Sequence, residues 1–252
     1  MTRLRAAIGG ARVALGLLTI VPVGGVLPDE AALRAAPGWF PIVGGLVGAA
    51  AAAVWIVVEP LLGATYASAL ALTVSAIAAG ALHHDGLADS ADGLGARGGG
   101  AERRLAAMRD PGIGAYGAIA LIAFVLLALT ALSQLQPAKA AAALVTGHVL
   151  GRWSTLPQLA RLAAARADGL GAGYSAGPIA VLIGSGGAGV IALATCGIAP
   201  AAAALAGAAL AAVAVAAAAQ RTIGGRTGDT LGASVLVTEV VVYSVLAAYW
   251  GT

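Results

Sequence analysis

The sequence has little cysteine and little charge. Its 252 residues include one cysteine, so no disulfide can form within the chain. Charged residues make up 10% of it, whereas about 25% is usual in a soluble globular domain. Together with 60% hydrophobic residues, this composition excludes an ordinary soluble globule. Further His and Cys residues at ligand spacing are also missing, which argues against a zinc site.

Long apolar runs occupy most of the chain. They predict an all-α, polytopic membrane helix bundle of about six to seven transmembrane helices, in a single domain over residues 1–252. Abundant Ala and Gly suit close packing between such helices. The expected spans are Trp39–Val58, Leu61–Leu82, Ala115–Leu132, Ala140–Leu156, Pro178–Cys196, Ala201–Ala219 and Ala233–Trp250.

The first apolar run, residues 13–27, is interrupted by Pro22 and by two glycines. Proline disfavours a plain span, so we expect an interfacial or partly inserted helix here. The run has no convincing cleavage site, and no removable signal segment is therefore expected.

The basic residues test this layout. When the N-terminus is placed inside, twelve of the 14 Lys and Arg residues lie on one side, Lys139 lies on the other and Arg152 lies within a span. This bias predicts a multi-pass membrane protein whose polar segments face the cytoplasm. The small net charge of +3 reports topology and indicates contact with membrane lipid and with no nucleic acid.

Acidic residues gather in one stretch, residues 83–117. Asp85, Asp89 and Asp92 have the spacing that places three side chains on one face of a helix. Carboxylates this close repel one another, and the loss of hydration near a membrane raises the cost, so a cation is expected there. Oxygen ligands favour Mg²⁺ or Mn²⁺. Asp110, on a following helix that begins near Ala101, is a fourth candidate ligand.

Cations accompany these acids. Gly86 and Gly93 leave room for a bulky phosphate beside the backbone, and arginines supply charge for its oxygens. Acids for a metal and arginines for an anion are the parts of phosphoryl transfer. The alternative is an ordinary solvated loop. The spacing of the acids disfavours it, but for Arg103 and Arg104 it is as good an interpretation as a functional role. His83 either orients a carboxylate, binds phosphate or marks the membrane interface.

A second polar segment, residues 220–232, precedes the last span. Its glycines leave backbone N–H groups facing an anion at the start of that helix. Asp229 is either a metal ligand, a base or the N-cap of the helix. Arg152 and Glu239 lie within expected spans, where charges line a polar cavity or pair with each other.

These motifs resemble those of a known family. His83, the run from Asp85 to Gly93 (DGLADSADG), Met108-Arg109-Asp110 and Ile113-Gly114-x-Tyr116-Gly117 are similar to the signature of the cobalamin synthases, a family of adenosylcobinamide-GDP ribazoletransferases. Further similar blocks follow in the family's order, namely Leu17-Leu18-Thr19-x-x-Pro22, Phe40-Pro41-x-x-Gly44, Arg152, Gly169-Leu170-Gly171, the run 224–233 (GGRTGDTLGA) and Glu239.

The resemblance implies a Mg²⁺-dependent, multi-pass enzyme of the bacterial cytoplasmic (inner) membrane, with its active site facing the cytoplasm. Its reaction would join adenosylcobinamide-GDP to α-ribazole or α-ribazole 5′-phosphate and release GMP. A homo-oligomer and contacts with other enzymes of nucleotide-loop assembly are compatible with this activity. With the residue pattern, it implies catalytic Asp85, Asp89 and Asp229, and metal ligands Asp85, Asp89, Asp92, Asp110 and Glu239. The implied substrate-binding residues are His83, Arg97, Arg104, Arg109, Arg152, Arg226 and Thr227.

Some positions depart from the family pattern. Ser90 stands where Thr is usual, Pro111-Gly112 replaces a Ser-Arg pair, and Leu236 replaces a Glu.

Two other functions fit parts of the pattern. A CDP-alcohol phosphotransferase shares the run Asp89-x-x-Asp92-Gly93-x-x-Ala96-Arg97, but its further Gly and fourth Asp are missing. A cation-coupled transporter would place acids at the bilayer midplane and show two related halves, whereas these acids cluster at one face.

Overall fold

The computed structural model describes residues 2–24, 28–169 and 173–251. In these ranges the chain is helical and forms no strand, and one isolated bridge joins Ala164 to Arg226. The predicted all-α fold is therefore confirmed. The helices are α1 (Thr2–Leu18), α2 (Glu30–Ala35), the 3-10 helix η1 (Ala36–Trp39), α3 (Phe40–Leu62), α4 (Ala64–Ala78), α5 (Leu82–Gly95), α6 (Gly100–Ala107), α7 (Ala115–Ser133), α8 (Pro137–Trp153), α9 (Thr155–Arg161), α10 (Pro178–Cys196), α11 (Ile198–Ile223) and α12 (Gly228–Trp250).

Five helical segments of the described chain are long and apolar enough to cross a membrane, or six when α4 and α5 count as one broken span. The five cover Glu30–Leu62, Ala115–Ser133, Pro178–Cys196, Ile198–Ile223 and Gly228–Trp250. The expected span over 140–156 corresponds to α8, which has 17 residues and lies buried at the centre of the bundle between α3, α10 and α12. The membrane bundle is thus confirmed, with fewer full spans than the apolar runs suggested.

The expected span Leu61–Leu82 is broken. Its helix α4 ends at Ala78, and α5 continues at an angle of 91° to it. Gly80 and Ala81 have φ values of 58° and 56°, a left-handed turn that no α-helix can pass through. The turn directs the three Asp of α5 away from the axis of the apolar α4. We therefore treat the 14-residue α5 as lying outside the spanning segments.

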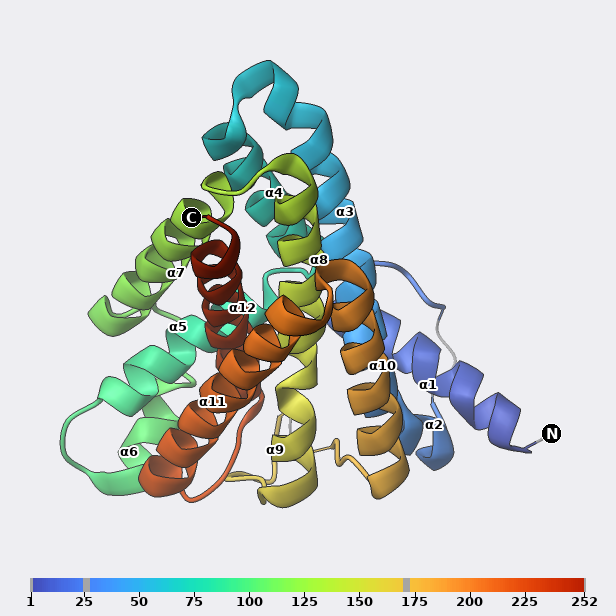
Figure 1. The fold of residues 1–252 in the computed structure, drawn as a ribbon. Helices are drawn as coiled ribbons and strands as arrows, with labels where there is room; N and C mark the ends of the chain where they lie inside the picture. Colours follow the sequence, from blue (N-terminus) through green and yellow to red (C-terminus); the bar gives the residue numbers. More distant parts are fainter. Residues whose placement is uncertain (1, 25–27, 170–172, 252) are drawn as a thin grey trace.

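Small residues form much of the core, as the composition predicts. Ala51 of α3, Ala143 of α8 and Ala208 of α11 are fully buried in one apolar cluster with Leu144 and Tyr243. Alanine lets the helix axes approach closely, so van der Waals contact can hold the bundle together where the surroundings are apolar. In Figure 1, α8 and α12 run through the middle of the bundle, with α3 and α10 on the right, α7 on the left and α11 crossing the lower part.

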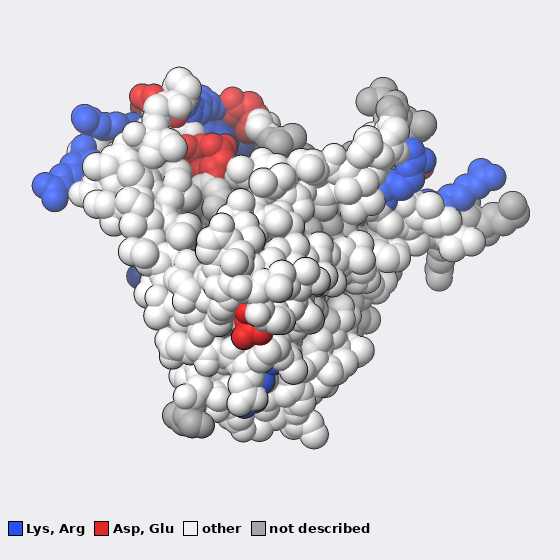
Figure 2. Space-filling view, turned by 90° about the horizontal axis from the view of Figure 1, so that it is seen from above, with Lys and Arg blue, Asp and Glu red and all other residues white. Residues whose placement is uncertain are grey.

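Charge is confined to a small part of the surface. Figure 2 shows the acidic and basic side chains gathered mainly along one edge, whereas most of the visible face carries none. Large apolar side chains such as Leu61, Ile179 and Leu210 are more than 70% exposed on the outside of the bundle. Such a surface suits contact with lipid, which is consistent with a membrane protein.

Candidate active site

Helix α5 carries the predicted row of acids, and the row divides between two environments. Asp85 is exposed and Asp89 is half-buried. Asp92, three residues further on, accepts hydrogen bonds from the backbone N–H groups of Gly114, at 2.7 Å, and Gly117, at 3.0 Å. Its carboxylate thereby satisfies donors at the start of α7, where helix N–H groups otherwise lack partners. Asp92 thus joins α5 to α7, a structural role that is separate from its predicted role as a metal ligand.

The second polar segment lies directly against α5. A Cβ atom on the buried Gly86 would come within 2.8 Å of the Asp229 carbonyl oxygen and 3.2 Å of the Gly232 Cα atom. Only glycine at this position lets α5 approach the first turn of α12 so closely. The contact brings Asp85 and Asp229, which are 144 positions apart in the chain, to the same cavity.

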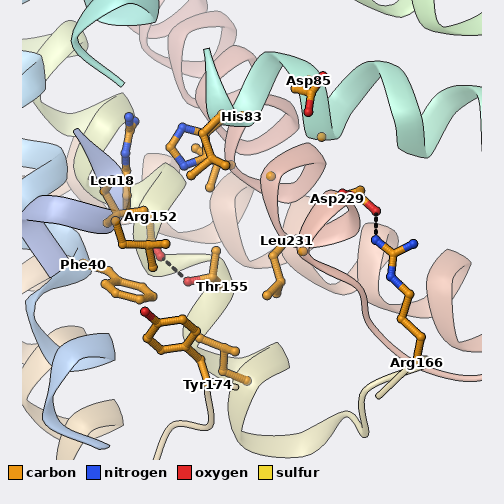
Figure 3. Close-up of a pocket in the computed structure, with 17 residues that line it drawn as sticks. Leu18, Phe40, His83, Asp85, Arg152, Thr155, Arg166, Tyr174, Asp229 and Leu231 are labelled. Atoms are coloured by element: carbon orange, nitrogen blue, oxygen red, sulfur yellow. Dashed lines mark hydrogen bonds and ion pairs between the residues drawn. The ribbon is translucent and has the colours of Figure 1, made fainter. Parts of the chain in front are cut away.

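We call this the central cavity; it has a volume of about 200 Å³. Figure 3 shows Asp85 of α5 above Asp229 on one side, and His83, Arg152, Phe40 and Tyr174 on the other. Its wall combines these polar groups with an apolar surface. The lining residues are Leu17, Leu18, Phe40, Leu82, His83, Asp85, Gly86, Arg152, Thr155, Leu159, Arg166, Tyr174, Gly228, Asp229, Leu231, Gly232 and Val235.

Asp229 is held by an arginine that the sequence did not single out. The Arg166 guanidinium donates to its carboxylate at 2.8 Å, and both side chains are largely buried. A short backbone pairing positions this arginine, because Ala165 donates to the carbonyl of Arg226 and Arg226 donates to that of Ala163. In the sequence, Arg166 counts only among the basic residues that indicate topology, although it lies three positions before the Gly169-Leu170-Gly171 block.

The N-cap interpretation of Asp229 is wrong, because Thr227 is the cap of α12. The Thr227 hydroxyl accepts the N–H of Thr230, and the Thr230 hydroxyl accepts that of Thr227, which forms a reciprocal capping box. The carboxylate of Asp229 is thus available to the cavity and to Arg166. Thr227 itself, predicted to bind substrate, is buried in this cap and does not line the central cavity.

Arg152 and Glu239 pair with each other inside the bundle. The guanidinium of Arg152 binds Oε1 of Glu239, and Nδ1 of His148 lies 2.7 Å from the same oxygen. All three side chains are about 2% exposed. Arg152 also lines the central cavity, whereas Glu239 lies behind it and does not. The structure therefore brings Arg152 to the site and places Glu239 on Arg152 rather than among the acids of α5.

Other predicted residues lie outside the central cavity. Arg97 is exposed, Arg104 donates to the backbone carbonyl of Leu94, and Arg109 pairs at the surface with Asp168 at 2.5 Å. Asp110 is exposed too, and it accepts the N–H of Gly112 within its own turn.

Arg226 is buried behind the cavity wall. Its guanidinium donates to the carbonyls of Leu162 and Tyr174, among other partners, so it fixes the segment after α9. The Gly169-Leu170-Gly171 motif cannot be placed in the same way, because Leu170 and Gly171 lie outside the described residues.

Comparison with known proteins agrees with the ordered motifs. A family model described as cobalamin-5-phosphate synthase matches residues 10–247. The chain belongs to this family. It is 38% identical to the adenosylcobinamide-GDP ribazoletransferase of Bradyrhizobium diazoefficiens over 98% of this chain and 96% of that protein. The corresponding protein of Ralstonia nicotianae is 37% identical over 99% and 98%, and that of Mesorhizobium japonicum is 41% identical over 80% and 78%. No solved structure matches the chain.

In this cobalamin-5-phosphate synthase family member, Asp89 has other carboxylates nearby, from its own helix and from Asp229. Burial is the main cause that raises the pKa of Asp89 to about 6, and the neighbouring Asp85 carboxylate raises it further. A carboxyl whose ionised form is disfavoured by other carboxylates gains from a bound cation. The described part of the chain holds no three His, Cys, Asp or Glu side chains already close enough to form a complete metal cluster. This donor set fits Mg²⁺, which typically takes only one or two carboxylates and completes its shell with water and substrate phosphates.

Proposed function

We propose that the chain transfers the cobinamide-phosphate group of adenosylcobinamide-GDP to α-ribazole or α-ribazole 5′-phosphate and releases GMP. The curated relatives that match nearly the whole chain carry the name of this activity. The observation that supports it most directly is the central cavity, where carboxylates and arginines from four separate parts of the chain meet. A site that combines anions for a metal with cations for phosphate oxygens suits transfer of a phosphoryl group.

The reaction makes one bond and breaks one. A ribose hydroxyl of the acceptor attacks the phosphorus that carries the cobinamide arm, and a new O–P bond forms. The bond from that phosphorus to the bridging oxygen of the diphosphate breaks, and GMP leaves with this oxygen. The hydroxyl proton passes to a carboxylate in the cavity wall, for which Asp85 and Asp229 are both placed.

The cations of the cavity would hold the phosphates during this step. Arg152 lines the cavity, and its ion pair with Glu239 holds the guanidinium in place there. Arg166 stands beside Asp229 and keeps that carboxylate oriented. His83, in the first turn of α5, contributes a ring nitrogen to the same wall. Positioning and charge stabilisation of this kind account for most of the catalysis in phosphoryl transfer.

Asp85 and Asp89 would hold Mg²⁺, one helical turn apart on α5. The bound ion would neutralise the charge that develops on the diphosphate as GMP leaves. We place the cavity at the cytoplasmic face of a bacterial inner membrane, because twelve of the 14 basic residues fall on that side of the chain.

Membranes that contain the protein would test the proposal directly. They would receive adenosylcobinamide-GDP, α-ribazole 5′-phosphate and Mg²⁺, and release of GMP and formation of the corrinoid product would be followed. We expect one GMP to be released for each corrinoid product, and we expect this activity to be lost when the metal is chelated. An absence of product together with turnover of CDP-diacylglycerol would instead assign the chain to CDP-alcohol phosphotransfer.

A further inference from the structure

The central cavity is too small for both substrates. Ligand sites of drug-sized molecules have volumes of about 300–1,000 Å³. The central cavity has about 200 Å³, and two substrates must meet at it. Parts of the substrates must therefore extend beyond its walls.

A second cavity adjoins it. This cavity, which we call the α1 cavity, has a volume of about 470 Å³. Leu17 and Tyr174 line both cavities, so the two are separated by a shared wall. The other residues of the α1 cavity come from α1, from the connection after it and from the start of α2. Nothing in the proposed reaction so far uses this space.

Two arginines give the α1 cavity its chemistry. Arg5 and Arg12 lie seven residues apart in α1, so they point to the same side of the helix about two turns from each other. Arg12 donates to the backbone carbonyl of Val23 at 2.7 Å, which holds its guanidinium in place. A guanidinium has five N–H donors, so most of those on Arg12 remain for a ligand.

Glycines of α1 allow the neighbouring segments to pack closely beside these arginines. A Cβ atom on Gly9 would lie 2.8 Å from the Cβ atom of Ala32, and one on Gly16 would lie 2.6 Å from a methyl group of Val23. The bare α1 surface at these glycines therefore allows α2 and the connection to lie against it. Asp29, the acidic side chain of the wall, accepts the N–H of Ala32 at 2.7 Å as the cap of α2.

We propose that the α1 cavity is the subsite for the 5′-phosphate of the acceptor. This inference rests on the proposed function. The family description names a 5-phosphate product, and that phosphate takes no part in bond making or breaking, so it needs a place of its own. A phosphate monoester carries about −1.5 to −2 charges at pH 7, which two arginines match better than they match the single charge of a lipid phosphodiester. Leu17 and Tyr174 line both cavities, so an acceptor held by its phosphate on Arg5 and Arg12 would lie against the wall that faces the central cavity.

Steady-state kinetics with two acceptors would test the subsite. The variants Arg5→Ala, Arg12→Ala and the double variant would each be given α-ribazole 5′-phosphate or unphosphorylated α-ribazole. The double variant is expected to raise the KM of the phosphorylated acceptor by about tenfold or more, because two charged hydrogen bonds are lost. The KM values of α-ribazole and of adenosylcobinamide-GDP should stay within about twofold of the wild type. Arg12→Lys, which keeps the charge, should restore part of the discrimination.

Arg34→Ala is the matched control. Arg34 is an exposed arginine of the neighbouring α2, it pairs with Glu30 and it does not line the α1 cavity. It should leave all three KM values unchanged. Inorganic phosphate should inhibit the wild type in competition with the phosphorylated acceptor, and this competition should disappear in the double variant.

Three results would overturn the proposal in different ways. An equal change of KM for both acceptors would show that the arginines serve structure alone. If the variants keep unchanged KM values but their activity no longer responds to phosphatidylglycerol in phosphatidylcholine vesicles, the cavity binds a lipid headgroup instead. Wild-type membranes that release no GMP at all would remove the proposed function itself, before any variant is compared.

Discussion

Arg166 and Asp229 form an ion pair of 2.8 Å in the wall of the central cavity, although 63 positions separate them in the chain. Their side chains are only 16% and 19% exposed, so water screens the pair less than it screens a surface salt bridge. The pair joins the connection after α9 to the first turn of α12. Arg166 therefore fixes a carboxylate of the proposed site although it lies outside both polar segments, residues 83–117 and 220–232.

Loss of Arg166 should impair catalysis. Arg166→Ala would leave Asp229 without its partner, and we expect kcat/KM to fall by about ten- to a hundredfold, the value of one charge-assisted hydrogen bond. Arg166→Lys should recover part of the loss. Arg161→Ala is the control, because Arg161 is an exposed arginine at the end of α9, five positions earlier. Equal kinetic effects of Arg161→Ala and Arg166→Ala would contradict the assigned role.

Glu239 should stabilise the protein through Arg152. Removing one partner of a buried ion pair leaves an uncompensated charge and costs about 3–5 kcal/mol. We therefore expect Glu239→Leu to lower the free energy of unfolding by this amount, as measured with denaturant in mixed micelles. The double variant Glu239→Leu/Arg152→Met should regain most of the stability and remain inactive, because Arg152 lines the central cavity. An active double variant would show that the cavity does not need this arginine.

The sequence predicted the local parts of the site and the membership of Asp229, but it did not predict the contacts that hold the distant parts together. The acidic helix follows from the spacing of Asp85 and Asp89, and the joining of Asp229 to them follows from ordered motifs. The break before α5 could not be predicted, because it depends on Ala81, a residue type that rarely takes a left-handed conformation. Neither could the partner of Asp229, since Arg166 reaches it through a backbone pairing between residues 164 and 226.

The pairing of Arg152 with Glu239 illustrates the same limit. Apolar sequence on both sides indicates that each charge lies within the bundle and needs a partner or a polar cavity. Which of the two it finds depends on the rotation of α8 against α12. In the structure Arg152 has both, the carboxylate of Glu239 behind it and the cavity in front.

Substitution of Asp92 should affect the Mg²⁺ requirement of the enzyme less than substitution of Asp85 or Asp89. Because its carboxylate accepts the N–H groups of Gly114 and Gly117, Asp92→Ala is expected to lower the free energy of unfolding by about 0.5–2 kcal/mol, like the loss of a helix cap. Asp85→Asn and Asp89→Asn are expected to raise the Mg²⁺ concentration needed for half-maximal activity while the protein stays folded. Titration of activity with Mg²⁺ would compare all three. A shift for Asp92→Ala as large as that for Asp89→Asn would make Asp92 a ligand as well.

The contact between α5 and α12 at Gly86 offers the sharpest test of the site's geometry. In Gly86→Ala the new methyl group would meet backbone atoms of Asp229 and Gly232, which cannot turn aside as a flexible side chain can. We expect α5 to move away from α12, at a cost of about 1–3 kcal/mol in stability. Activity should fall further than stability does, because Asp85 and Asp229 would no longer face the same cavity. Gly186→Ala in α10 is the matched control, since its Cβ atom would meet nothing within 4 Å and alanine favours a helix by up to about 1 kcal/mol. If both variants keep wild-type kcat in the presence of saturating substrates and Mg²⁺, the close approach of α5 to α12 is not what assembles the site.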